Sequence, residues 1–179
     1  MGLIKNKKGY SLLELLIVLG IVSALIAAAF LIYPKVRAHQ QVEEETKNLT
    51  AIQAGMKSLY AGRIKLDSLS TALFAQSGNA PQQMIIDDGQ ALQNVWKGSV
   101  QLGYDGNHGK YHVEYDNVPS DVCSKFVAAV QGDFVKVSIY AATSGDSKDM
   151  ETGTAFDVAK TTEACGSDTT ATILFYSEI

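Results

Sequence analysis

An apolar stretch of 22 residues near the start of the chain, Leu12–Tyr33, constrains the fold more than any other feature. It reads LLELLIVLGIVSALIAAAFLIY, and Glu14 is its single charged residue. As a helix it would be about 33 Å long, at roughly 1.5 Å per residue, which is enough to cross the hydrocarbon core of a bilayer. A carboxylate in such a segment costs on the order of 2.5–3.5 kcal/mol. The position of Glu14 therefore calls for an explanation.

Three interpretations account for this stretch and for the basic residues before it, Lys5, Lys7 and Lys8. A secretory signal peptide combines a basic start with an apolar core, and Ala27–Ala29 would be its cleavage site. A plain membrane anchor would keep its basic end on the cytoplasmic side. The third interpretation is a leader peptide that is cut after Gly9. Glu14 favours this third interpretation, because neither a signal-peptide core nor a plain anchor gains from an acidic residue.

The segment Gly9–Ala28, GYSLLELLIVLGIVSALIAA, resembles the N-terminal motif of type IV pilins. The matching features are a glycine, a carboxylate five residues after it and then an unbroken apolar run. The resemblance implies that a dedicated prepilin peptidase and methyltransferase cuts after Gly9 and methylates the new N-terminus at Tyr10. Glu14 would then be the fifth residue of the mature chain.

In the mature chain the carboxylate of Glu14 has a physical role. Tyr10 would carry a free α-amine in an apolar setting, and a buried charge is tolerated when it is paired. We expect Glu14 of one subunit to pair with the Tyr10 amine of a neighbour and so to set the register of subunits. The alternative is a carboxylate that lies at the membrane interface. Gly20 and Ser23 are small enough to allow close helix approach, although they also fit ordinary helix composition.

The remainder of the chain is long enough for one soluble domain. The predicted organisation is a leader at residues 1–9, an apolar helix at 10–33 and a globular head at 34–179. Ten of the 15 basic residues and 18 of the 19 acidic residues follow Arg37, which gives this part a formal net charge of −8. This charge argues against binding to nucleic acid.

Beyond Pro34 the helix is predicted to continue to near Gly62, because the apolar pattern resumes. Five apolar residues follow spacings of 7, 3, 4 and 3, which places them on one helix face: Val42, Leu49, Ile52, Met56 and Leu59. Charged residues lie opposite this stripe, among them Glu43, Glu44 and Lys47. We expect the stripe to pack against a sheet of the same domain.

The later part of the chain predicts an α+β fold, a long N-terminal helix on a mainly antiparallel sheet. Alternating residues at 100–104 and 111–115 predict a hairpin. A short helix is expected from Asp67 to Gln76, and a second from Pro119 to near Gly132. Further strands are expected at Phe134–Ala141 and Thr170–Ser177, and a polar surface loop at Thr143–Thr154.

The two cysteines, Cys123 and Cys165, are predicted to form a structural disulfide in an oxidising compartment outside the cytoplasmic membrane. In the chain-entropy model a loop of about 43 residues gives roughly 4 kcal/mol of stabilisation. Two cysteines without nearby histidines make a poor metal site.

Two short segments sharpen the resemblance. Val118–Cys123 (VPSDVC) and Asn94–Gly98 (NVWKG) look like segments of type IVb pilins, including those of conjugative thin pili. The resemblance implies a disulfide-bounded C-terminal region that forms much of the exposed subunit surface. The short leader and the mature start at Tyr10 depart from most type IVb pilins.

No other group of residues predicts a catalytic or metal site. His108 and His112 are four apart but fall on the predicted hairpin, and His39 lies among polar residues. Asp87–Gly89 is expected to be a turn, since calcium needs more oxygen ligands than it offers. With no nucleophile–base pair, phosphate loop or zinc motif, we expect neither an enzyme nor a cofactor.

These observations together predict a structural subunit that is made as a precursor in the bacterial inner membrane and polymerises into an extracellular pilus for adhesion or conjugative contact. The resemblance implies as partners other copies of the chain, the prepilin peptidase, an assembly platform with its ATPase, and an outer-membrane secretin. The alternatives are a pseudopilin of a type II secretion system, a single-pass anchored binding or enzyme domain, and a domain secreted after cleavage at Ala29.

Overall fold

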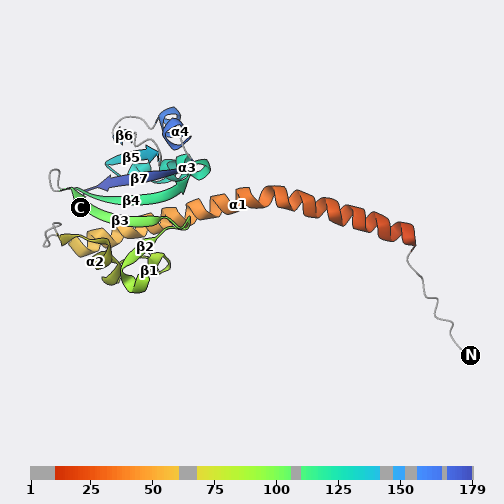
Figure 1. Ribbon diagram of the computed structural model, residues 1–179, viewed down its shortest axis with the longest axis horizontal. Helices are drawn as coiled ribbons and strands as arrows, with labels where there is room; N and C mark the ends of the chain where they lie inside the picture. The colour runs from red at the N-terminus through yellow and green to blue at the C-terminus, as the bar shows by residue number, and fades with distance from the viewer. Residues whose placement is uncertain are drawn as a thin grey trace, which may run out of the picture. The chain divides into compact units, whose positions relative to one another are not determined.

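The structure is a computed structural model that describes residues 11–60, 68–105, 110–141, 147–151, 157–166 and 169–178. The chain divides into two units, Met1–Ala38 and His39–Ile179. Helix α1, Leu12–Tyr60, contributes to both and contains Pro34, so the predicted continuation of the helix past the proline is confirmed (Figure 1). Its predicted end near Gly62 lies outside the described residues.

The described residues of the second unit form a seven-stranded sheet in the order β1-β2-β3-β4-β7-β5-β6, with antiparallel neighbours (Figure 1). The strands are β1 Ile85–Ile86, β2 Ala91–Gln93, β3 Ser99–Asp105, β4 Lys110–Pro119, β5 Lys136–Ala141, β6 Ser147–Glu151 and β7 Thr170–Ser177. The last strand along the chain, β7, lies between β4 and β5. The predicted α+β class and the antiparallel sheet are confirmed.

The predicted hairpin is the pair β3–β4, in which Val100 lies opposite Tyr115 and Leu102 opposite Val113. One face of the sheet is buried, since alternate residues of β4 and β7 are inaccessible. These residues include Tyr111, Val113 and Tyr115 in β4 and Ala171, Ile173 and Phe175 in β7. The alternation arises because successive side chains of a strand point to opposite faces.

The predicted apolar stripe of α1 is buried at Val42, Leu49, Ile52 and Met56, and half-buried at Leu59. Helix α3, Ser120–Val130, buries Phe126 in the same core. The Phe126 ring meets the rings of Tyr115 and Phe175 edge to face, at centroid distances of 5.3 and 5.5 Å. This arrangement is favoured by the charge distribution of aromatic rings.

Three details of the predicted elements differ from the structure. Helix α2, Thr71–Gln76, begins later than predicted because the Ser70 hydroxyl accepts the N–H of Leu73 at 3.2 Å as its N-cap; Asp67 lies outside the described residues. Pro119 is extended and ends β4, so its predicted place inside the helix is wrong.

The third difference concerns the predicted loop Thr143–Thr154. The prediction is wrong for Ser147–Glu151, which form strand β6. The strand pairs with β5 through backbone groups, and polar residues supply these as well as apolar ones do. Helix α4, Val158–Gly166, was also not predicted. Short 3-10 turns complete the described fold: Gln82–Met84, Asp87–Gly89 and Gln131–Asp133.

Candidate functional site

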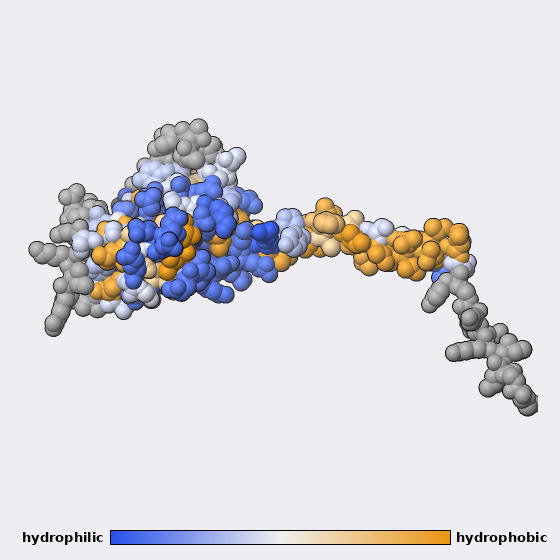
Figure 2. Space-filling view, turned by 60° about the horizontal axis from the view of Figure 1, so that its bottom comes forward, coloured by the Kyte–Doolittle hydropathy of each residue, from blue (hydrophilic) through white to orange (hydrophobic). Residues whose placement is uncertain are grey.

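Helix α1 presents a long apolar surface from Leu12 to Val36. Its large hydrophobic side chains are exposed by 44% at Val22 to 77% at Leu12 and Leu31, and they form the orange stretch of the helix in Figure 2. Among the described residues, α1 is the one helix whose length and composition suit a membrane span. A soluble monomer rarely exposes so continuous an apolar surface. This segment therefore requires lipid or other apolar helices around it.

Glu14 lies in the first turn of α1 and is exposed. The helix is already formed there, since the Leu15 N–H donates to the Ser11 carbonyl at 3.1 Å. A carboxylate in the first turn interacts favourably with the helix dipole. Gly9 and Tyr10, the predicted processing residues, lie outside the described residues, so the pairing of Glu14 with the Tyr10 amine stays a prediction.

Gly20 and Ser23 place no large side chain on the surface of the apolar part of α1. A Cβ atom added at Gly20 would have no atom within 4 Å, among those outside its own turn of helix. The Ser23 hydroxyl donates to the Leu19 carbonyl at 2.7 Å, so its polar group is satisfied within the helix. Both positions are compatible with the close approach of a second helix, which stays a prediction.

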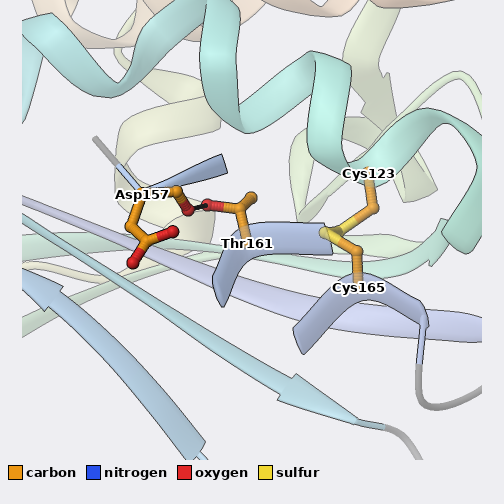
Figure 3. The surroundings of a disulfide bond; sticks show 4 residues. All are labelled: Cys123, Asp157, Thr161 and Cys165. Atoms are coloured by element: carbon orange, nitrogen blue, oxygen red, sulfur yellow. Dashed lines mark hydrogen bonds between the residues drawn. A yellow bond between two sulfur atoms is a disulfide. The ribbon is translucent and has the colours of Figure 1, made fainter. Parts of the chain in front are cut away.

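The predicted disulfide between Cys123 and Cys165 is confirmed, with Cα atoms 5.7 Å apart (Figure 3). Cys123 lies in α3 and Cys165 in α4, and both are buried. The bond joins residues 42 positions apart in the sequence. It therefore ties the helix before β5 to the helix before β7.

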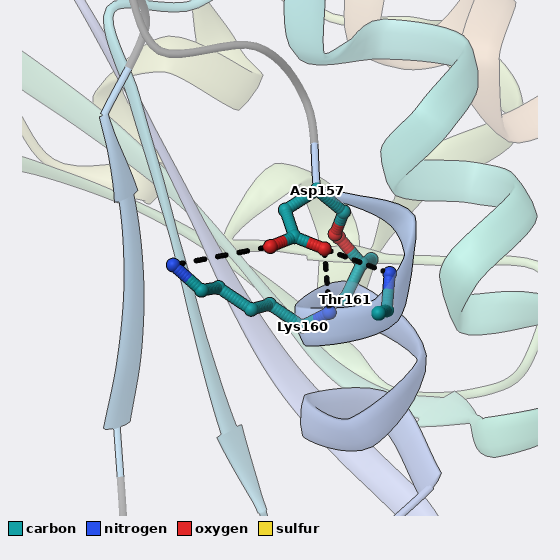
Figure 4. A network of polar contacts seen from close by, with 4 residues as sticks. Asp157, Lys160 and Thr161 are labelled. Atoms are coloured by element: carbon teal, nitrogen blue, oxygen red, sulfur yellow. Dashed lines mark hydrogen bonds and ion pairs between the residues drawn. The ribbon is translucent and has the colours of Figure 1, made fainter.

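Asp157, for which no role was predicted, fixes the other end of α4 (Figure 4). Its Oδ1 accepts the backbone N–H groups of Ala159 and Lys160 at 3.0 and 3.1 Å, and its Oδ2 lies 3.9 Å from Lys160 Nζ. Its carbonyl accepts the N–H and the hydroxyl of Thr161 at 3.0 and 2.9 Å. Asp157 is thus an N-cap, and an aspartate before the helical run was the signal that could have found it.

The NVWKG segment, Asn94–Gly98, is a turn between β2 and β3 that is organised by the buried side chain of Asn94. Its Oδ1 accepts the N–H groups of Trp96 and Gly98, both at 2.9 Å. Its Nδ2 donates to the carbonyl of Asp116 at 2.7 Å. We name this segment the Asn94 turn. The Asn94 side chain has a structural role, because its amide group forms hydrogen bonds with three backbone groups.

The Asn94 turn contacts strand β4 where the pairing register of β4 with β7 shifts, between Tyr115 and Val118. There Asn117 has a φ of 55°, and its Nδ2 donates to the carbonyl of Trp96 at 3.1 Å. The Trp96 ring meets Phe126 of α3 edge to face at 5.5 Å. The turn therefore contacts both the sheet and α3.

Glu45 of α1 is fully buried, and its Oε2 accepts the N–H of Val95 in the Asn94 turn at 3.0 Å. Burial raises the pKa of its carboxyl from 4.5 to about 7, against the lowering effects of Val95, Tyr115 and Asn48. The sequence held a signal for this residue. The spacing of seven between Val42 and Leu49 leaves position 45 on the buried helix face.

The structure does not bring the described residues among the other sequence candidates together in one site. His112 lies in β4 with its ring 5.6 Å from that of Tyr176, His39 is exposed, and His108 lies outside the described residues. Asp87–Gly89 is a turn, as predicted, with φ angles of 51°, 54° and 85°. In the part of the chain that the structure describes, no three His, Cys, Asp or Glu residues are grouped to hold a metal ion.

Comparisons with known proteins agree with this description. The family model described as "PilS N terminal" matches residues 39–178, and the "Prokaryotic N-terminal methylation motif" matches residues 4–30. The fold is similar to the crystal structure of TcpA, a type IV pilin from Vibrio cholerae El Tor biotype. The TM-score is 0.55 at 14% identity, over 78% of this chain and 99% of that one. A comparison with curated proteins found no match.

The first family model covers most of the chain, and the second contains the segment around Gly9 and Glu14. The likeness to the pilin structure, at this low identity, concerns the fold. In this chain the fold combines a long N-terminal helix with an antiparallel sheet, and such a fold and family are structural rather than enzymatic. The chain therefore belongs to the PilS family and is a type IV pilin.

Proposed function

We propose that this protein is the subunit of an extracellular type IV pilus. The observation that carries the proposal is the exposed apolar surface of α1, which begins with Glu14 in the first helical turn. Before assembly, Leu12–Tyr33 anchors the precursor in the bacterial inner membrane. The match of residues 4–30 to the methylation motif supports cleavage after Gly9 and methylation of Tyr10.

Assembly exchanges one apolar environment for another. The apolar helix, residues 10–33, leaves lipid and packs among the same helices of neighbouring subunits, while the head, residues 34–179, faces outward. Glu14 pairs with the Tyr10 amine of a neighbour, because an unpaired charge in that bundle is costly. A head-to-tail contact that does not close generates an open helical filament.

The proposed partners follow from this route. They are the prepilin peptidase and methyltransferase, an assembly platform with its ATPase, an outer-membrane secretin and further copies of the chain. The disulfide between Cys123 and Cys165 supports a head that folds in an oxidising compartment. The likeness of VPSDVC and NVWKG to type IVb segments supports a role in adhesion or conjugative contact.

Mass spectrometry of the N-terminus of the mature protein tests the processing step. We expect a chain that begins with N-methylated Tyr10. A chain that begins at Phe30 would indicate a signal peptide, and an intact Met1 would indicate a plain anchor; either result contradicts the proposal.

A second experiment tests the role of Glu14. The Glu14→Ala variant should be cleaved and methylated normally but should form few filaments, counted by electron microscopy. Glu43→Ala, which removes an exposed carboxylate further along α1, is the matched control and should assemble normally. Normal filament number and length for Glu14→Ala would show that the carboxylate does not guide assembly.

A further inference from the structure

One buried carboxylate joins α1 to the Asn94 turn. Glu45 has 0% exposure, and its Oε2 accepts the Val95 N–H at 3.0 Å. Its Oε1 is also buried and has no hydrogen-bond partner among the described residues. The contact links residues 50 positions apart, so it joins α1 to a distant part of the chain.

Among the described residues, the groups that act on Glu45 do not include a cation. From β4 it is approached by Tyr115, which is 0% exposed. From α1 itself the neighbours are Asn48, whose Oδ1 accepts the Gln83 side chain, and the exposed Glu44. The Asn94 turn contributes the neutral N–H of Val95. Because no described residue supplies a positive charge to this carboxylate, burial shifts its equilibrium toward the neutral acid.

We propose that Glu45 is a proton-operated latch between α1 and the Asn94 turn. In its neutral form the carboxyl holds the turn against the helix without burying a charge. When it loses its proton, the cost of keeping a charge buried outweighs the stronger hydrogen bond from the Val95 N–H, and α1 from Val42 to Tyr60 packs less firmly in the head. The head is therefore more stable in mildly acidic than in mildly alkaline medium.

The direction of the effect follows from proton linkage. Burial raises the pKa of Glu45 to about 7, from 4.5 for an ordinary carboxyl. Between these two values the folded chain binds more protons than the unfolded chain, so the folding equilibrium constant falls as the pH rises through this window. Since each pKa unit is worth a factor of ten, the whole window corresponds to a change on the order of 100-fold.

The protein contains an intrinsic fluorescence probe for this contact. Trp96, the single tryptophan, follows Val95 directly in the Asn94 turn. Denaturant unfolding of the full-length protein in detergent micelles, followed by Trp96 fluorescence, measures the folding equilibrium at a series of pH values from about 5 to about 8. The measurement uses the unassembled subunit, so its outcome is independent of whether the protein forms pili.

We expect the wild-type equilibrium constant to fall on the order of 100-fold over this range. Glu45→Gln should be nearly insensitive to pH, because a glutamine oxygen still accepts the Val95 N–H. Glu45→Met, which replaces the group by an apolar one of similar size, should be equally insensitive. Glu43→Gln, which changes another exposed carboxylate of α1, is the matched control and should keep the wild-type pH dependence. A flat wild-type profile, or a wild-type slope in Glu45→Gln, would overturn the proposal.

Discussion

The amide of Asn94 donates from Nδ2 to the carbonyl of Asp116 at 2.7 Å, which joins the turn before β3 to the irregular part of β4. These residues are 22 positions apart in the sequence. The same side chain accepts two N–H groups of its own turn. A single buried amide thus shapes the turn and attaches it to the neighbouring strand.

Replacing Asn94 by alanine should therefore lower the free energy of unfolding by about 2 kcal/mol or more, because buried backbone donors lose their partner. Denaturant unfolding followed by Trp96 fluorescence measures this loss. The adjacent Gln93→Ala is the control: that side chain is half-buried and makes only a 3.5 Å contact with the Lys97 carbonyl. Equal, small losses in both variants would show that Asn94 does not organise the turn.

Gly98 should not tolerate a side chain. A Cβ atom there would lie 1.9 Å from the Asp116 carbonyl oxygen, so Gly98→Ala must displace the backbone of β4. We expect a loss of about 1–3 kcal/mol or more in the free energy of unfolding, as for other overpacked sites. Gly132→Ala, where nothing lies within 4 Å of the added atom, should be neutral or slightly stabilising. A neutral Gly98→Ala would contradict the close approach.

The disulfide should contribute strongly to the stability of the head. Removing it in Cys123→Ala/Cys165→Ala should lower the free energy of unfolding by about 2–5 kcal/mol. A reducing agent should destabilise the wild type by a comparable amount and leave the double variant unchanged. If the reducing agent lowers the stability of both proteins equally, it does not act by breaking this disulfide.

The N-cap of α4 can be tested at Asp157. Asp157→Ala should cost about 0.5–2 kcal/mol, since the N–H groups of Ala159 and Lys160 lose their acceptor. Asp157→Ser keeps an acceptor oxygen at the cap and should cost much less. Amide hydrogen exchange in α4 should accelerate in the alanine variant alone. Unchanged exchange in Asp157→Ala would mean that the disulfide holds α4 without help from the cap.

The sequence predicted those elements in which apolar residues repeat with a clear period. The stripe Val42–Met56 and the alternation in β3 and β4 are of this kind, and both are confirmed. Glu45 was missed because a carboxylate within a buried stripe looks like an interruption of the apolar pattern. Strand β6 and helix α4 were missed because edge pairing and capping depend on backbone groups, which leave little trace in side-chain hydrophobicity.

The site residues also differ in how readily the sequence reveals them. Glu14 and the cysteines are chemically unusual in their surroundings, so a single residue was enough to draw attention to each. Asn94 was noted only as part of a short motif, because its role depends on Asp116, which is distant in the sequence. A contact of that kind becomes visible only when the strands are assembled.

The place of β7 between β4 and β5 has a consequence for the timing of folding. Because synthesis begins at the N-terminus, β1 to β4 and β5 to β6 are synthesised before β7, the strand that joins them. The two groups of strands cannot form one sheet until residues 170–177 are available. Such long-range pairing is slow, so completion of the sheet is the late step in the folding of the head.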